Sequence, residues 1–505
     1  MSIHKVQTHE KSDLASEVID FHSIEKPARR LLALFSLVIL LAVIALHFGL
    51  VDLGQWALDE FSVIALYRDY GWTGFVRRLI GWSPRPISEL LIWCYAYLVN
   101  WTHKPLIGLF LGSVWLTLIS APLISFLQIR KTSLKNSQGS LFLSLFAFTT
   151  IALFLLGHSP GQLFYWPMGA AAYLTTLSAT TLCFLQLAFS LTENFLGRVI
   201  TSFSLIIAAG SSETGAFFVV VFSCLSLAQM AVHAIRDTCR RQKVLWFLIP
   251  SLVGIGVFLL LLQNRVQNQD PLFRNPEYHH LLLSLKAAVG QTFKECLVTG
   301  QRLSTRSILL GLLLKGCFLL ALRYCWLSSG MKVPRRQPMV VLAIALAATI
   351  YFSVAACYYG FGGPSNDRHH ELRQCLIILF IATAATLSCS FHRTVCNLSK
   401  LEWLAAAFVF VTIVLAVPPR ISALKHDYEN YPVCIESRRR SWNSGLLNGD
   451  AMIWFSPPQG RVANTYINRP GTYNVKSKSP DFAVTVMQFF KKKSLEIRPY
   501  IASAK

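Results

Sequence analysis

Runs of about 20 apolar residues recur along the 505-residue chain, and they constrain its fold more than any other feature. A run of this length is what an α-helix needs to cross the hydrocarbon core of a bilayer. The composition agrees, because 53% of the residues are hydrophobic and 14% are charged. We therefore predict an all-α polytopic membrane protein.

The apolar runs predict about eleven membrane-spanning helices. The first, residues 31–50, is too long for the apolar core of a signal peptide and lacks a small-residue cleavage site. The aromatic stretch 85–101 has only about 15 apolar residues, so we expect it to lie in the membrane interface. The remaining spans are expected at 104–127, 140–157, 169–191, 199–210, 214–235, 244–262, 306–326, 338–358, 373–391 and 402–418.

Basic residues give the chain a formal charge of +22, and they gather in short clusters between the apolar runs. This distribution is typical of charges that set membrane topology, so we exclude nucleic acid as a partner. The clusters predict that the tail 1–30 is cytoplasmic. The short loops 158–167 and 211–213 contain no Lys or Arg and are expected outside.

The membrane domain is expected to cover residues 31–418, with longer outside loops at 51–103 and 263–305. The second of these loops contains HHLLLSLKAAVG, an amphipathic turn suited to the membrane surface or to a lid over a cavity. Residues 419–505 leave the membrane and alternate polar stretches with β-prone ones such as AMIWF and FAVTVMQFF. We expect them to form a small extracytoplasmic domain that is α/β or β-rich.

The cysteines and histidines indicate no metal site and no cofactor. The twelve cysteines include no metal-spaced CxxC pair, and most lie inside apolar runs, where free cysteine behaves as a small hydrophobe. His279 and His280 are adjacent, and neighbouring residues of a helix point apart, so a metal there would need ligands from elsewhere.

An acid pair, Asp59 and Glu60, follows the first apolar run within a few residues of the membrane boundary. Acids at that depth are costly unless they are paired, hydrated or used, so the pair is a candidate functional site. The alternative is a solvated loop whose acids balance the nearby Arg77, Arg78 and Arg85.

Several outside stretches fit one family together. LDEF at 58–61, GWSPRPISELL at 81–91 and the KPL turn at 104–106 resemble the GT-C superfamily of integral-membrane glycosyltransferases. FYWPMGAAAY at 164–173 looks like the FYW-x-x-G-x-x-x-Y element of bacterial GT-C-like proteins, including relatives of O-antigen glucosylating enzymes. AAGSSETG at 208–215 is similar to their Gly-rich turn with a Glu.

The resemblance implies an enzyme of the bacterial inner (plasma) membrane that takes sugar from a polyprenyl-phosphate donor. Its partners would be that donor, membrane lipids, and a lipid-linked or cell-surface glycan as acceptor, such as lipopolysaccharide. The chain departs from the family where a second Asp or an Asn is expected beside the acids, since Glu60 follows Asp59 and Ser212 precedes Glu213. These departures leave the sugar and the metal dependence open.

Sugar transfer needs a carboxylate to accept the hydroxyl proton of the acceptor and cationic groups to stabilise the departing phosphate. We assign the base role to Asp59, with Glu60 orienting the sugar or acceptor or, alternatively, forming a salt bridge to a loop arginine. Arg85 and Arg368 are the leading phosphate ligands, because the guanidinium fork matches phosphate oxygens. The alternative for such arginines is snorkelling toward lipid headgroups.

Other residues complete the expected site. His369 and Arg373 share GGPSNDRHHELRQC with Arg368 at the mouth of a helix. Lys315, near the middle of an apolar run, should face a cavity or an acidic partner, unless a shifted helix moves it toward the interface. The residues expected to line the sugar or acceptor site are His158, Tyr165, Trp166, Glu213 and His279.

A transporter or flippase of lipid-linked sugars is the main alternative function, since it would share the cationic cavity and the number of spans. Such transporters are commonly built from internal repeats, and the sequence has no convincing one. A non-catalytic assembly protein is the third possibility, and it would tolerate the loss of Asp59.

Overall fold

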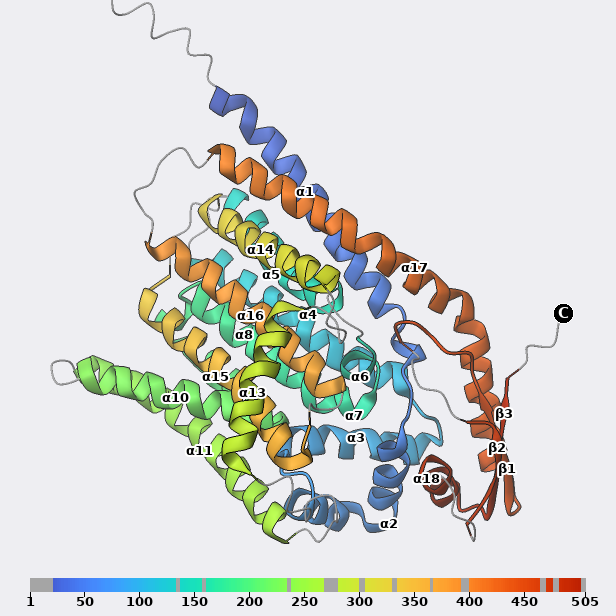
Figure 1. Cartoon of the computed structure of the whole chain (residues 1–505). Coiled ribbons are helices and arrows are strands. Elements are labelled where there is room, and N and C mark those ends of the chain that lie inside the picture. The colour runs from blue at the N-terminus through green and yellow to red at the C-terminus, as the bar shows by residue number, and fades with distance from the viewer. Residues whose placement is uncertain are drawn as a thin grey trace, which may run out of the picture.

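The structure is a computed structural model in which most of the described chain is α-helical, with a small sheet near the C-terminus (Figure 1). The described residues are 21–132, 137–156, 160–233, 238–267, 280–298, 305–328, 334–363, 367–391, 399–463, 469–475 and 481–500. The long helices are α1 Phe21–Phe48, α2 Leu58–Gly81, α3 Pro86–Thr102, α4 Ile107–Thr132, α5 Ser137–Leu156, α8 Thr175–Ala188, α9 Phe195–Ser211, α10 Glu213–His233, α11 Thr238–Gln267, α13 Leu281–Leu297, α14 Thr305–Ser328, α15 Arg336–Phe361, α16 Asp367–Phe391, α17 Ser399–Leu446 and α18 Asp481–Phe490.

Five stretches within the described residues are long and apolar enough to cross a membrane. They are Ala33–Leu53, Ile107–Arg130, Pro167–Ala188, Arg336–Phe361 and Arg368–Cys389. The chain is therefore a helical membrane protein. The other expected spans also fall on helices, namely α5, α9, α10, α11, α14 and α17.

The helix α8 lies at the centre of the bundle and is buried over almost its whole length. It packs against α4, α9 and α16 (Figure 1). Just before it, the short helices α6 (Gly161–Phe164) and α7 (Pro167–Gly169) and the π-helix η2 (Ala170–Leu174) make a compact entry into the bundle. The expected span at 169–191 thus begins with a π turn, a feature that often occurs at functional sites.

The expected outside loop 51–103 is mostly helical. The 3₁₀ turn η1 (Val51–Leu53) leads into α2, and α3 follows. The positive φ of 53° at Gly71 bends α2, a conformation that glycine adopts without a steric penalty. The stretch 51–103 therefore contains the N-termini of both α2 and α3.

Near the C-terminus, three strands form one sheet in the order β1-β3-β2. The strand β1 (Ala451–Ser456) runs parallel to β3 (Ser494–Pro499), and β2 (Gly471–Asn474) runs antiparallel to β3. The stretch AMIWF forms β1, as its composition predicts.

One expectation about the C-terminal segment is wrong. The stretch FAVTVMQFF forms the helix α18, because Phe482, Val486, Phe489 and Phe490 fall on one face at helical spacing and are buried together. The helix α17, which is 48 residues long, runs through residue 419, where the C-terminal segment was expected to begin.

The C-terminal segment packs directly on the stretch that carries the acid pair. The ring of Trp56 lies 5.0 Å from that of Trp442 on α17, and Phe61 lies 5.8 Å from Phe482 on α18. Arg438 donates hydrogen bonds to the carbonyl oxygens of Asp52 and Gly54 at 2.5 and 2.6 Å. These contacts fix the start of α2.

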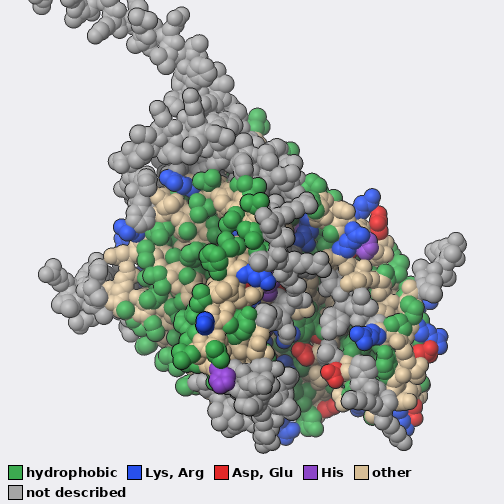
Figure 2. All heavy atoms as spheres, in the orientation of Figure 1, with side chains coloured by type: hydrophobic (Ala, Val, Ile, Leu, Met, Phe, Trp, Pro, Cys, Tyr) green, Lys and Arg blue, Asp and Glu red, His purple; other side chains and the backbone are tan. Residues whose placement is uncertain are grey.

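Hydrophobic side chains cover much of the helical part of the face shown in Figure 2. Most of the Asp and Glu side chains in that view lie instead on the side formed by α2, α17 and the sheet. The surface therefore separates an apolar helical region from a more charged region around the C-terminal segment.

Candidate functional site

Five helices begin in one region of the structure, and the residues at their starts form a polar cluster. The helices are α2, α3, α7, α10 and α16. In the four longer helices, α2, α3, α10 and α16, the first N–H groups lack partners within the helix and the N-terminus carries a partial positive charge. We define the polar cluster as Glu60, Arg85, Trp166, Tyr173, Glu213, Arg368 and His369, which the contacts below connect.

Arg85 and Glu213 form the central ion pair of the cluster. Arg85 is the residue just before α3, and its Nη2 donates to Oε1 of Glu213, the first residue of α10, at 2.8 Å. Their side chains are 24% and 25% exposed. Burial lowers the pKa of Arg85, but the carboxylate of Glu213 raises it above the ordinary value, so the guanidinium stays charged. Its Nε is buried and has no hydrogen-bond partner in the described part of the chain.

The turn between α9 and α10 sets the position of Glu213. The Ser212 side chain caps α10, because its Oγ accepts a hydrogen bond from the N–H of Gly215 at 3.0 Å and lies 2.8 Å from Oγ1 of Thr176. A Cβ on Gly215 would lie 2.0 Å from the carbonyl oxygen of Ala208, so only glycine fits there. The SSETG sequence thus fixes the position of Glu213 at the start of α10.

Arg368 and His369, from the start of α16, contact aromatic rings of the α7–η2 segment. The guanidinium carbon of Arg368 lies 5.0 Å from the ring centroid of Trp166, and that of Arg85 lies 5.7 Å from the ring centroid of Tyr173. His369 Nε2 is 3.4 Å from the hydroxyl oxygen of Tyr173. The two arginines therefore flank one short aromatic segment, a cation–π arrangement that favours guanidinium groups.

Arg368 has the same unused hydrogen-bonding capacity as Arg85. Its Nε is buried without a partner among the described residues. Buried N–H groups normally find partners, and leaving one unpaired costs free energy. These donors are what an anion entering the cluster would use.

Glu60 is fully buried and joins the start of α2 to α7. Its Oε2 accepts a hydrogen bond from the N–H of Ala57 at 2.8 Å, and its Oε1 accepts one from the N–H of Met168 at 3.2 Å. The expected alternative, a salt bridge from Glu60 to a loop arginine, is wrong. Arg78 instead donates to Oε2 of the buried Glu89 at 2.8 Å.

Burial raises the pKa of the Glu60 carboxyl group from 4.5 to about 8, partly opposed by Trp166 and by the two backbone donors. Between those pH values the native chain retains a proton that the unfolded chain has lost, so stability falls as the pH rises. The free energy of unfolding should fall by up to about 1.4 kcal/mol for each pH unit in this range. We therefore expect the purified protein to unfold at a lower temperature at pH 8 than at pH 5.5. Glu60→Gln should flatten this pH dependence, and equal slopes in the two proteins would exclude a buried, titrating Glu60.

Asp59 differs sharply from its neighbour. It is exposed, and its carboxylate makes no hydrogen bond or salt bridge within the described residues. Successive helical residues point about 100° apart, so Asp59 does not share the buried environment of Glu60. The acid pair thus consists of one buried residue in the cluster and one solvated residue at the start of the same helix.

Three further predicted site residues have their side chains engaged in other contacts. Tyr165 is buried and donates to the carbonyl oxygen of His47 on α1 at 2.8 Å. Arg373 pairs with Glu295 on α13, and Lys315 donates to backbone carbonyl groups at the end of that helix. Backbone oxygens therefore take the ammonium group of Lys315, in place of the acidic side chain or cavity that was expected.

His158 and His279 lie outside the described residues. Tyr173, the last residue of FYWPMGAAAY, belongs to the polar cluster and was not predicted from the sequence. Glu89, within GWSPRPISELL, was also not predicted; it lies outside the cluster as defined and pairs with Arg78. Both stretches were recognised as motifs, and an aromatic or acidic residue inside an otherwise apolar motif is the signal that identifies them.

A cavity of about 230 Å³ lies at the start of α15 and is lined by residues that include Arg198, Trp246 and Arg335. No member of the polar cluster lines this cavity. Within the described ranges, no group of three or more His, Cys, Asp and Glu side chains is placed to hold a metal ion.

The polar cluster combines two arginines that have buried free Nε donors, several helix N-termini, the ionised carboxylate of Glu213 and the buried carboxyl group of Glu60. Such a combination binds an oxyanion well, because helix N-termini and guanidinium groups both favour negative charge. The exposed carboxylate of Asp59 stands close in sequence to the buried part of the cluster. Comparisons with protein-family models, with curated proteins and with solved structures found no match to this chain.

Proposed function

We propose that this protein is a GT-C-type glycosyltransferase that moves a sugar from a polyprenyl-phosphate donor to a hydroxyl group of a lipid-linked or cell-surface glycan. The observation that carries the proposal is the pair of arginines, Arg85 and Arg368, which stack on one aromatic segment and keep buried N–H donors free. A phosphate with one sugar substituent presents the oxygens that these donors would bind.

In this proposal the acceptor oxygen attacks the anomeric carbon while the bond from that carbon to the phosphate oxygen breaks. The phosphate leaves with the electron pair, and Arg85 and Arg368 stabilise its charge. Asp59 accepts the proton of the attacking hydroxyl group, because its solvated carboxylate is free to do so. Glu60 holds α2 against α7 through two backbone N–H groups and so orients Asp59.

The proposed topology has eleven spans, a cytoplasmic N-terminus and an outside C-terminal segment. Two contacts between distant loops support it. Arg85 and Glu213, from two loops assigned outside, form an ion pair, and Arg335 and Glu193, from two loops assigned to the cytoplasm, form another at 3.1 Å. Loops on opposite sides of a bilayer could not meet in this way.

This topology predicts that a cysteine at Asn448 reacts with a membrane-impermeant maleimide from outside, whereas one at Asn194 reacts only after the membrane is opened. Both positions are exposed, so accessibility depends on the side of the membrane. Labelling would be measured in intact cells above the level of the unsubstituted protein. Labelling of Asn448→Cys only after permeabilisation would reverse the assigned orientation.

The enzymatic proposal is tested by incubating the purified protein with a series of polyprenyl-phosphate sugars and with lipid-linked or polysaccharide acceptors. Mass spectrometry of the acceptor should show a gain of one hexose and the matching release of polyprenyl phosphate. Transfer should require both substrates. Absence of acceptor glycosylation across the series, from protein that is folded and binds polyprenyl phosphate, would count against a transferase and favour a lipid carrier.

A further inference from the structure

The helix α13 ends inside the helical bundle. Its residues Ser284 and Ala288 are buried on the side that faces α15, where the hydroxyl group of Tyr351 donates to the carbonyl oxygen of Leu285 at 3.0 Å. On its other side, large apolar residues are exposed, including Leu282 and Phe293. The helix therefore has one side anchored on the bundle and one side left free.

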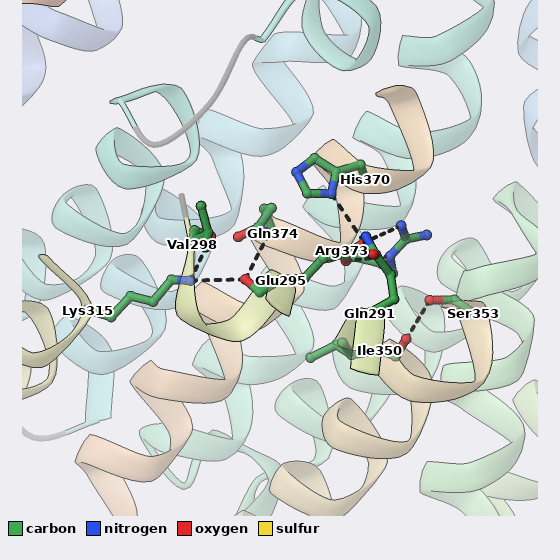
Figure 3. Close-up of polar contacts among 9 residues, drawn as sticks. All are labelled: Gln291, Glu295, Val298, Lys315, Ile350, Ser353, His370, Arg373 and Gln374. Atoms are coloured by element: carbon green, nitrogen blue, oxygen red, sulfur yellow. Dashed lines mark hydrogen bonds and ion pairs between the residues drawn. The ribbon is translucent and has the colours of Figure 1, made fainter. Parts of the chain in front are cut away.

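Lys315 caps the C-terminal end of α13 (Figure 3). Its Nζ donates to the carbonyl oxygens of Glu295, Cys296 and Val298 at 3.1, 2.6 and 3.3 Å. The last carbonyl groups of a helix have no partner within it, so this lysine satisfies them. Lys315 is ten residues into α14, or about 15 Å along its axis, so α13 reaches well into the bundle.

Glu295 connects the same end of α13 to α16. The guanidinium group of Arg373 donates to both carboxylate oxygens, from Nε to Oε2 and from Nη2 to Oε1, each at 2.8 Å. His370 Nδ1 lies 3.3 Å from Oε1, and Gln374 Nε2 donates to the Glu295 carbonyl oxygen at 2.9 Å. The side chains of Glu295 and Arg373 are 1% and 2% exposed, so water weakens this pair little.

The partners of Glu295 belong to the helix segment that carries the proposed phosphate ligands. His370 and Arg373 follow Arg368 by two and five residues, within about the first two turns of α16. Glu371, between them, accepts a hydrogen bond from the N–H of Leu163 on α6 at 2.8 Å, just before the aromatic segment. Successive residues of one rigid segment thus contact α13, α6 and the polar cluster.

We propose that Glu295 is a positioning residue. By holding His370, Arg373 and Gln374 it fixes the first turns of α16 and thereby sets Arg368 and His369 against Trp166 and Tyr173. The inference rests on the proposed function only for its catalytic consequence, because the coupling of α13 to α16 is a property of the fold itself.

The test is Glu295→Gln, which keeps the size of the side chain and removes the charge that Arg373 and His370 contact. Hydrogen exchange by mass spectrometry should become faster in peptides covering both 281–298 and 367–375. With polyprenyl-phosphate sugar as the probe, the donor KM should rise by about 10- to 100-fold while kcat changes much less, because the loss of one charged hydrogen bond from a displaced Arg368 to the donor phosphate weakens binding by about that factor. Glu193→Gln is the matched control, since it breaks the exposed ion pair to Arg335 and should change neither readout.

Unchanged exchange in 367–375 together with a wild-type donor KM in folded Glu295→Gln would overturn the proposal. If that variant does not fold, Gln374→Met is used instead, because it removes a single hydrogen bond to the Glu295 carbonyl oxygen. Exchange in both peptides should then be faster than in the wild type, by a smaller factor. Wild-type exchange in both peptides of Gln374→Met would also overturn the proposal. If the wild-type protein transfers no sugar but Glu295→Gln loosens both peptides, the proposed function fails while the coupling of α13 to α16 stands.

Discussion

Asp59→Asn is expected to lower sugar transfer by about 10²- to 10⁴-fold, the usual contribution of a general base. Asparagine keeps the size of the side chain and some of its hydrogen bonding, but it does not accept a proton at neutral pH. Because the Asp59 carboxylate makes no contact within the described residues, stability and membrane insertion should be unchanged. Turnover of the purified variant is compared with its yield and its thermal unfolding.

The matched control is Asp69→Asn. Asp69 is an exposed acid on the same helix, and its ion pair within the described residues is with the adjacent Arg68 at 2.8 Å. An exposed pair of this kind contributes about 0 to 1 kcal/mol, so the control should retain transfer. Glu60→Gln separates the two acids of the pair. If it abolished transfer while Asp59→Asn stayed active, the two roles would be exchanged; activity in both variants would make the acid pair structural.

The double variant Arg85→Gln/Glu213→Gln is expected to raise the donor KM by about 10- to 100-fold, the effect of losing one charged hydrogen bond worth about 1.5 to 3 kcal/mol. Changing both residues removes the ion pair without leaving either charge unpaired in a partly buried site. A loss of donor affinity in the double variant therefore reports a missing phosphate contact. Donor titrations at saturating acceptor measure it.

The corresponding double variant at the other end of the bundle, Arg335→Gln/Glu193→Gln, removes an ion pair of the same chemical type and should leave the donor KM unchanged. Arg85→Lys should lie between the wild type and the double variant, since it keeps the charge but loses the fork. A wild-type donor KM in Arg85→Gln/Glu213→Gln would assign this pair to packing alone and leave Arg368 as the remaining phosphate candidate.

Much of the helical framework can be predicted from the sequence, because apolar runs of sufficient length have few other stable structures in a membrane. The errors lie where tertiary contacts decide. The stretch FAVTVMQFF has β-prone residues, yet it forms α18 because its aromatic residues pack against α2. Residue 419 marks a change in composition, but α17 continues through it.

The sequence indicates every member of the polar cluster except Tyr173, but it does not indicate how the members pair. Arg85 and Glu213 are 128 residues apart, and the packing of α3 beside α9, which leads into α10, brings them together. Asp59 and Glu60 look alike in the sequence, whereas in the structure one is exposed and the other meets the backbone of Met168. Lys315 in an apolar run signals a buried contact, but the sequence gives no sign that the contact is the end of α13.

The most direct test of the central claim uses the purified protein in liposomes that contain a polyprenyl-phosphate sugar and a lipid-linked acceptor. The quantity to measure is the sugar covalently joined to the acceptor, with the release of polyprenyl phosphate followed in parallel. We predict one polyprenyl phosphate released for each sugar transferred, only when acceptor is present and only with Asp59 intact. Movement of intact donor across the bilayer without any glycosylated acceptor would contradict the account and identify a transporter instead.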